Sequence, residues 1–165
     1  MMKKIKVYLE SSALWNLYYE EEGATLVEFC LDASELNCFS SIWSLLELHR
    51  GIQKRQNQQE LDQAEATNLR MFVDTDLQLL IVKKKLSLLQ VSEDVVNKAK
   101  QYIPRYNLFA SDALHLATAV VRTSSGLLVD DYHFERLDAS IEEKEGLKIW
   151  PTSLEVDAFR AALRI

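Results

Sequence analysis

The sequence predicts an α/β fold with a central parallel sheet of four to five short strands, flanked by helices on both faces. Short apolar runs rich in β-forming residues alternate with longer segments of helical periodicity, which is typical of βαβ units. Only 4 Gly and 2 Pro occur among 165 residues, which argues against a turn-dense all-β architecture. No internal repeat or break in composition divides the chain. We therefore expect a single domain spanning residues 1–165.

The N-terminal half opens with a β-rich run that ends at an acid. In order, its predicted elements are a strand at residues 5–9, helices at residues 11–19 and 25–33, a strand at residues 36–39, and a helix from residue 42 to about 55. The serine pairs Ser11-Ser12 and Ser40-Ser41 precede two of these helices, where a hydroxyl can cap the first backbone amides. Three glutamates followed by Gly23 end the first helix.

The C-terminal half continues the alternation. In order, its predicted elements are a helix from residue 61 to about 77, a strand at residues 86–91, helices at residues 92–103 and 110–122, a strand at residues 127–129, a short helix after residue 133, a strand at residues 147–150, and a helix from residue 154. Pro104 is expected to end the helix that precedes it. The expected core positions of the helix that begins at residue 61 are Leu61, Ala64, Leu69 and Phe72.

Composition excludes several classes of protein. The 19 Lys and Arg stand against 25 Asp and Glu, a net charge of -6, so the overall field repels nucleic acid. Any contact with nucleic acid therefore needs a local basic patch or bound cations. No run of roughly 20 apolar residues and no signal peptide is present, so we expect a cytoplasmic protein without a membrane span. Cys30 and Cys38 are expected to be buried free thiols.

Five acidic residues, at four places in the sequence, stand out from their surroundings. Glu10 ends the first predicted strand, and Asp130-Asp131 end the strand at residues 127–129. Ligands of open parallel sheets bind beyond the carboxyl ends of the strands, which is where these acids fall. Glu47 and Asp112 lie in helices whose neighbouring residues are otherwise apolar.

Helical periodicity places both of these acids beside a core-facing stripe. The expected stripe of the first helix is Ile42, Leu45, Leu46, His49 and Ile52, and that of the second is Ala113, Leu114, Ala117, Val120 and Val121. Glu47 lies off its stripe with Trp43, Arg50, Gly51 and Lys54, and Asp112 lies off its own with His115 and Ala119. His49 is thus predicted to be a core histidine. The three histidines have no metal-ligand spacing on one helix.

Each acid also has a simpler explanation. Glu47 would gain about 0.3 kcal/mol from pairing with Arg50, and Asp112 about 0.5 kcal/mol from the helix dipole. Asp130-Asp131 would serve as turn residues, and Glu10 as a surface charge at a strand end. Only the joint arrangement of the acids along the chain favours a shared site.

Four segments resemble, in order and spacing, the acidic motifs of PIN-domain ribonucleases. They are residues 7–14 (VYLESSAL), 44–51 (SLLELHRG), 111–119 (SDALHLATA) and 128–134 (LVDDYHF), of which the third is the most specific. The resemblance runs from Lys4 to about Ile149, nearly the whole chain. Its size is most similar to the toxin branch, the VapC-type ribonucleases of toxin–antitoxin pairs.

The resemblance implies a metal-dependent endoribonuclease with an acidic metal shell. Its catalytic metal ligands would be Glu10, Glu47, Asp112 and Asp131, with Asp130 as a substitute. Clustered carboxylates repel one another, and a divalent cation removes that cost; oxygen ligands favour Mg²⁺ or Mn²⁺. Ser12 would orient a carboxylate or water. Arg50 and Lys54 could hold RNA phosphates, although a solvated helix surface explains both equally well.

The resemblance also implies protein partners, namely a cognate antitoxin and a second copy of the chain in a homodimer. Trp15, Tyr18 and Tyr19 form an aromatic stripe that is more often core, and any exposed part of it would suit such an interface.

One position departs from the family pattern. The first acid of the family is ordinarily Asp, whereas this chain has Glu10. The extra methylene moves the carboxylate by about one bond length, and a misplacement of about 1 Å can impair catalysis strongly. The alternative reading is therefore a catalytically silent PIN-like module that binds RNA or protein.

Overall fold

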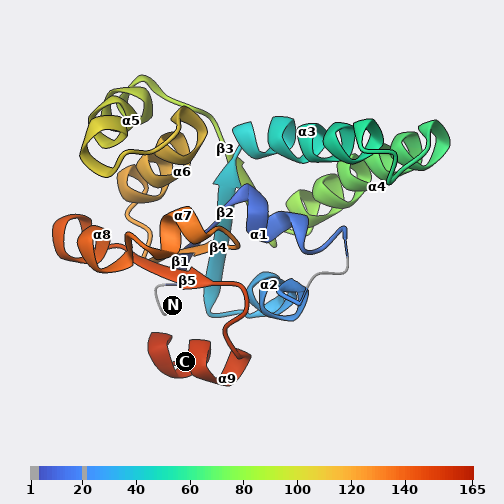
Figure 1. Ribbon diagram of the computed structural model, residues 1–165. Coiled ribbons are helices and arrows are strands. Elements are labelled where there is room, and N and C mark those ends of the chain that lie inside the picture. The colour runs from blue at the N-terminus through green and yellow to red at the C-terminus, as the bar shows by residue number, and fades with distance from the viewer. Residues whose placement is uncertain (1–3, 20–21) are drawn as a thin grey trace.

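A five-stranded parallel sheet forms the centre of the molecule (Figure 1). The structure is a computed structural model and describes residues 4–19 and 22–165. The strands are β1 (Ile5–Leu9), β2 (Leu36–Ser41), β3 (Leu86–Leu89), β4 (Gly126–Val129) and β5 (Lys148–Pro151). Their spatial order is β3-β2-β1-β4-β5, and every neighbouring pair is parallel. All carboxyl ends therefore lie at one edge, and the predicted α/β class is confirmed.

Helices cover both faces of this sheet. They are α1 (Ser11–Trp15), α2 (Ala24–Asp32), α3 (Trp43–Asn57), α4 (Gln63–Val82), α5 (Glu93–Tyr106), α6 (Ala110–Val121), α7 (Tyr132–Glu135), α8 (Asp138–Glu145) and α9 (Val156–Leu163). Side chains of β1 alternate between the faces, as the pleat requires. Val7 and Leu9 join the core formed with α1–α4 and α9, and Tyr8 joins the core formed with α5, α6 and α8.

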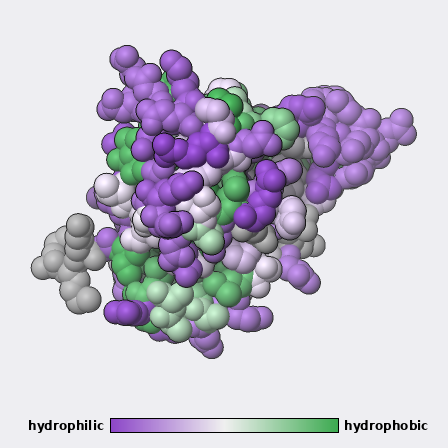
Figure 2. Space-filling view, turned by 60° about the vertical axis from the view of Figure 1, so that its left-hand side comes forward, coloured by the Kyte–Doolittle hydropathy of each residue, from purple (hydrophilic) through white to green (hydrophobic). Residues whose placement is uncertain are grey.

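The helices α3 and α4 form a hairpin whose end projects beyond the sheet (Figure 1). Hydrophilic side chains cover the projecting end, as Figure 2 shows at the right of the molecule. The side chains of Asp62 and Glu65 each accept a hydrogen bond from the other's backbone amide, which caps the start of α4. In this hairpin α3 follows the carboxyl end of β2 directly and α4 contacts β3, so the base of α3 lies at the carboxyl edge of the sheet.

Several predicted element boundaries were wrong. The first helix stops at Trp15, and residues 16–19 form turns, because Asn16 is fully buried and its amide binds Ser12 O and Thr152 Oγ1. The predicted stop at residues 20–23 lies partly outside the described residues. α5 continues through Pro104 to Tyr106, because the proline sits in the last, solvent-facing turn, where one lost hydrogen bond costs little. α4 continues to Val82, five residues beyond the predicted end.

The predicted core faces of the long helices were also partly wrong. In α3 the buried side chains are Ser44, Leu48 and Ile52, whereas Leu46 is exposed. This face is fixed by a polar contact that hydrophobic patterning cannot detect, since the hydroxyls of Ser40 and Ser44 lie 2.8 Å apart. His49 is not a core residue, because its Nε2 lies 2.8 Å from Asp74 on α4.

The faces of α4 and α6 differ in the same way. The buried residues of α4 are Ala66, Val73 and Leu77; Ala64 and Phe72 are exposed, and Leu61 and Leu69 are partly buried. In α6, Leu114, Val120 and Val121 are only partly buried, whereas His115 and Ala119 are buried. Both helices pack against neighbours on more than one side, so their buried faces are broader than a single stripe.

Other predictions agree with the structure. Cys30 and Cys38 are buried free thiols, and the Cys38 thiol donates to the carbonyl of Cys30 at 3.1 Å. Within residues 4–19 and 22–165, no helix has both the length and the apolar character needed to cross a bilayer.

Candidate active site

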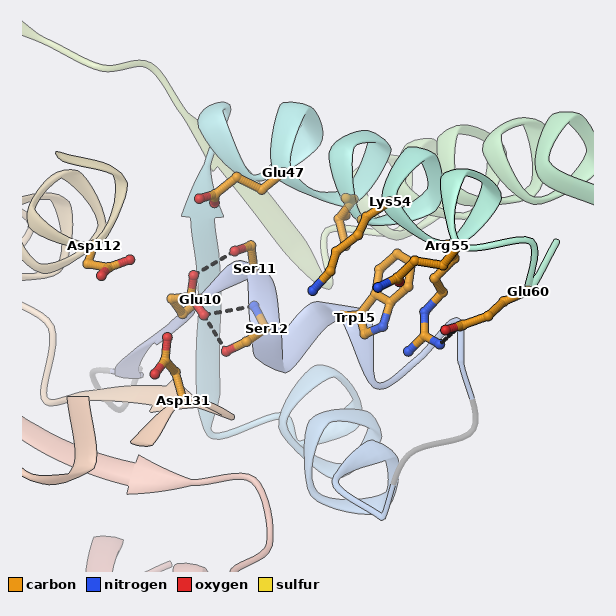
Figure 3. A pocket seen from close by; sticks show the side chains of 13 residues that line it. Glu10, Ser11, Ser12, Trp15, Glu47, Lys54, Arg55, Glu60, Asp112 and Asp131 are labelled. Carbon is orange, nitrogen blue, oxygen red and sulfur yellow. Dashed lines mark hydrogen bonds and ion pairs between the residues drawn. The ribbon is translucent and has the colours of Figure 1, made fainter. Parts of the chain in front are cut away.

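A cavity of about 500 Å³ opens at the carboxyl edge of the sheet (Figure 3). Its lining includes four acids from four separate segments: Glu10 follows β1, Glu47 lies on α3, Asp112 lies in the first turn of α6, and Asp131 precedes α7. The parallel strands bring the first and last of these together, and the two helices add the others from above the same edge. All four predicted catalytic acids therefore face one space.

Glu10 is held by the residues that follow it. Its side chain is almost fully buried, at 5% exposure. The Ser11 hydroxyl donates to Oε1 at 2.6 Å, and the Ser12 amide donates to Oε2 at 2.7 Å. The Ser12 hydroxyl also donates to Oε2 and accepts from the backbone amide of Asp130 at 2.8 Å. Ser12 thus links the ends of β1 and β4 and orients the Glu10 carboxylate.

His115 is the site residue that the sequence reading missed. Its ring is completely buried, with Nε2 2.5 Å from Glu47 Oε2 and 3.4 Å from Glu10 Oε1. The spacing from Asp112 is three residues on one helix, which places both side chains toward the same face. That spacing within the third acidic motif is the feature of the sequence that points to His115. The spacing between histidines does not point to it, because the partners of His115 are carboxylates.

A buried hydrogen-bonded chain runs from β2 through Tyr8 and His115 to Glu47. The Tyr8 hydroxyl accepts from the Ser41 amide at 3.1 Å and lies 2.6 Å from His115 Nδ1. Burial, with the nearby charge of Glu10, raises the pKa of Tyr8, so its hydroxyl keeps its proton. On the other side of the ring, Nε2 faces a carboxylate oxygen that only accepts, so Nε2 carries a hydrogen and donates to Glu47. His115 therefore orients Glu47 as a donor.

The charges of the site shift one another's pKa values. Burial, together with the negative charges of Glu10 and Asp131, raises the pKa of Asp112 to about 6. Burial opposes ionisation of Glu47, but the hydrogen bond from His115 and its positive charge outweigh this and lower the pKa of Glu47. Burial also opposes protonation of His115, but Glu10 and Glu47 outweigh it and raise the pKa of the imidazole. The site thus concentrates negative charge that one buried imidazole only partly offsets.

The donor set fits a divalent cation. Ligand atoms of Glu10, Glu47 and His115 all lie within 4.8 Å of one another. The carboxylate oxygens suit Mg²⁺ or Mn²⁺, and the uncompensated acids Asp112 and Asp131 line the same cavity. Because the Nε2 hydrogen points to Glu47, the carboxylates are the better ligands, with His115 holding them in place.

The remaining predicted site residues divide into two groups. Lys54 lines the cavity, whereas Asp130 is exposed and neither it nor Arg50 belongs to the lining. The cavity is also lined by residues that were not predicted from the sequence, and they include Ser11, Trp15, Arg55 and Glu60. Arg55 lies 3.5 Å from the ring centre of Tyr19 and forms an ion pair with Glu60 at 2.7 Å.

The predicted aromatic stripe is mostly packed. Tyr18 is buried, and its hydroxyl donates to Asp76 at 3.0 Å. Trp15 and Tyr19 are partly buried, and their rings stack on one another. The stripe therefore contributes a wall beside the cavity, with Arg55 against it.

Asp112→Asn is expected to stabilise the protein when metal is removed by a chelator. Between about pH 4 and 6 the folded protein keeps the Asp112 proton that the unfolded chain has lost, so wild-type stability falls as pH rises. The rise in pKa from 3.8 to about 6 corresponds to roughly 3 kcal/mol, which solvent screening of this partly buried group reduces to about 1–2 kcal/mol. Urea unfolding at pH 7.5 and pH 4 measures it. A variant no more stable than wild type at pH 7.5 would contradict the assignment.

Comparison with known proteins places this arrangement in a family. The PIN domain family description matches residues 7–140, most of the chain. Among proteins with curated descriptions, no sequence matches. Several solved structures are similar in fold, and three of them are described below; their sequence identities support a likeness of fold alone.

A DNA-bound VapBC complex from Salmonella typhimurium has a TM-score of 0.60 and 15% identity, covering 90% of this chain and 98% of the other. A toxin–antitoxin complex from Klebsiella pneumoniae has a TM-score of 0.57 and 15% identity, covering 86% and 94%. VapC20 from Mycobacterium tuberculosis, described as a sarcin-ricin loop cleaving toxin, has a TM-score of 0.57 and 12% identity, covering 79% and 93%. With the family match over residues 7–140 and the acids gathered at the carboxyl edge of the sheet, the chain belongs to the PIN domain family.

Proposed function

We propose that this protein is a metal-dependent endoribonuclease and the toxin of a toxin–antitoxin pair. The observation that carries the proposal is the convergence of Glu10, Glu47, Asp112 and Asp131 on one cavity from four separate segments of the chain. The simpler explanations of these acids, as surface charges, ion-pair partners or turn residues, do not require them to line one cavity. Burial first, and then the negative charges of Glu10 and Asp131, raise the pKa of Asp112, so these acids oppose one another's ionisation.

In this proposal the four acids hold Mg²⁺ or Mn²⁺. When bound there, the cation would supply a water of lowered pKa and stabilisation of the charge that develops in phosphodiester hydrolysis. Ser12 and Ser11 fix the Glu10 carboxylate, and His115 fixes Glu47. Lys54, on the rim, binds a backbone phosphate of the RNA. Neither Arg50 nor Asp130 lines the cavity, so we leave both out of the proposed site.

The toxin role rests on fold similarity to the toxin–antitoxin complexes from Klebsiella pneumoniae and Salmonella typhimurium. It implies that a cognate antitoxin binds this chain and that the chain forms a homodimer. Co-expression with the protein encoded beside it, followed by light scattering of the purified complex, tests both. A monomer that retains no neighbour-encoded protein would contradict this part of the proposal.

The nuclease activity is tested by incubating the protein with single-stranded RNA in Mg²⁺ or Mn²⁺, with and without a chelator. We expect cleavage in either metal and none in the chelator, because the acids then lack the cation that offsets their charge. Cleavage that persists in the chelator would refute the metal chemistry.

The second candidate is a catalytically silent PIN-like module that binds RNA or protein. It is favoured by Glu10, since serine donors already engage both of its carboxylate oxygens. Glu10→Asp separates the two candidates, because it restores the acid usual in the family. A wild-type protein that binds RNA without cutting it, together with a Glu10→Asp variant that cuts, would establish the silent module.

A further inference from the structure

A second cavity lies beside the acid cluster, at the start of α6. Its volume is about 280 Å³, and its lining consists of Asn107, Leu108, Phe109, Asp112, His133 and Arg136. Asp112 lines this cavity and the acidic one, so the two are joined across a single side chain. The two cavities are therefore adjacent.

We propose that this second cavity binds one unpaired base of single-stranded RNA, next to the phosphate held at the acid cluster. The proposal rests on the proposed ribonuclease function and names its substrate as an unpaired strand. The cavity shares Asp112 with the acid cluster but differs from it in the rest of its lining, which combines an aromatic surface with cationic and amide groups.

Phe109 provides the stacking surface. Its side chain lines the cavity and is nevertheless 73% exposed to solvent. The rings of Phe109 and His133 are perpendicular, with centres 6.4 Å apart at 86°, and the high exposure of Phe109 leaves ring surface open to another planar group. Tyr132 is 75% exposed on the neighbouring turn. Proteins that bind single strands stack unpaired bases on such rings.

Arg136 and Asn107 provide the polar contacts. Arg136 is exposed, and its Nε donates to the carbonyl of His133 at 3.4 Å, which holds the cation at the cavity wall. On a chain with a net charge of -6, a cation here is suited to a phosphate of the same strand. Asn107 is exposed in the left-handed conformation, at φ 51°, and its amide can donate to or accept from the edge of a base.

A base-paired strand does not suit this cavity. A paired base is stacked inside its helix, so only an unpaired base can present a face to Phe109. The proposal therefore predicts a preference for single-stranded RNA over a duplex of the same sequence, and it predicts that this preference depends on Phe109.

Binding without cleavage tests the proposal. Ca²⁺ replaces Mg²⁺ to neutralise the acids, gels check that the RNA stays intact, and fluorescence anisotropy measures the affinity of a labelled 12-nucleotide single strand. We expect Phe109→Ala to weaken binding at least about fivefold and Phe109→Trp to preserve it. Met71→Ala, which removes a large exposed apolar side chain that lines neither cavity, is the control and should bind as wild type does. Arg136→Gln should reduce the salt dependence of binding by about one phosphate contact.

Unchanged single-strand affinity in Phe109→Ala would overturn the proposal, as would an equal loss of affinity for a duplex. A change of oligomeric state in Phe109→Ala by light scattering, without loss of RNA affinity, would identify the ring as a protein contact instead. This assay measures binding and not cleavage. A wild-type protein that cuts no RNA would therefore refute the ribonuclease proposal, whereas the affinity of Phe109→Ala would still decide whether the second cavity binds a base.

Discussion

Asp112→Asn is expected to reduce metal-dependent RNA cleavage by about 100-fold or more. The amide keeps the size of the side chain but removes the negative charge at the junction of the acid cluster and the second cavity. Steady-state cleavage of a labelled single strand in saturating Mn²⁺ measures the loss. The same variant is expected to be more stable than wild type in chelator, so an inactive variant would not be explained by unfolding.

Asp130→Asn is the matched control for this experiment. It removes the same charge one residue from Asp131, but Asp130 is exposed and does not line the cavity. We expect its activity to stay within about twofold of wild type, because exposed charges are screened by solvent. Equal losses in Asp112→Asn and Asp130→Asn would show that general charge, and not the cluster, controls cleavage. Full activity in Asp112→Asn would contradict the site.

Gly126→Ala is expected to destabilise the fold by about 3 kcal/mol, equivalent to a melting temperature lower by roughly 10 °C. A Cβ at Gly126 would lie 1.7 Å from an atom of the Trp150 ring, which crosses over the strand at this point. The ring cannot easily retreat, because Trp150 is buried and packs edge-on against Phe159 at 5.0 Å. Thermal and urea unfolding measure the loss.

A double variant identifies the cause. Trp150→Leu removes the obstructing ring, so Gly126→Ala should cost at least about 1 kcal/mol less in that background than in wild type. Ser125→Ala, at the exposed neighbouring position, should change stability by less than about 0.5 kcal/mol. Additive effects of Gly126→Ala and Trp150→Leu would show that the ring is not the obstacle.

The strands and the order of elements could be predicted because their signals are local. Each strand is a short apolar run, and each of the five lies at or within two residues of its predicted place. Helix ends were less predictable. Pro104 was read as a stop, but the stop is supplied three residues later by Asn107 in a left-handed conformation. α1 ends early because Asn16 is buried by Thr152, a partner that lies 136 residues away.

The four acids could be found from the sequence because together they fall, in order and spacing, on segments that resemble the acidic motifs of PIN domains. Their neighbours could not. Ser44 can be buried because its hydroxyl contacts that of Ser40. His115 can be buried because its two ring nitrogens contact Tyr8 on β1 and Glu47 on α3. Polar side chains of this kind carry no hydrophobic signal, so a periodicity analysis places them on the wrong side of a helix.

The sequence by itself determined the α/β class, a parallel sheet of short strands, and the acidic residues at strand ends and on two helices. Only the tertiary structure decided which polar groups complete the site: His115 between two carboxylates, Arg55 and Trp15 along one wall, and Phe109 with Arg136 in a neighbouring cavity. The reason is physical. Secondary structure follows from interactions a few residues apart, whereas the burial cost of a polar side chain is decided by partners from distant segments.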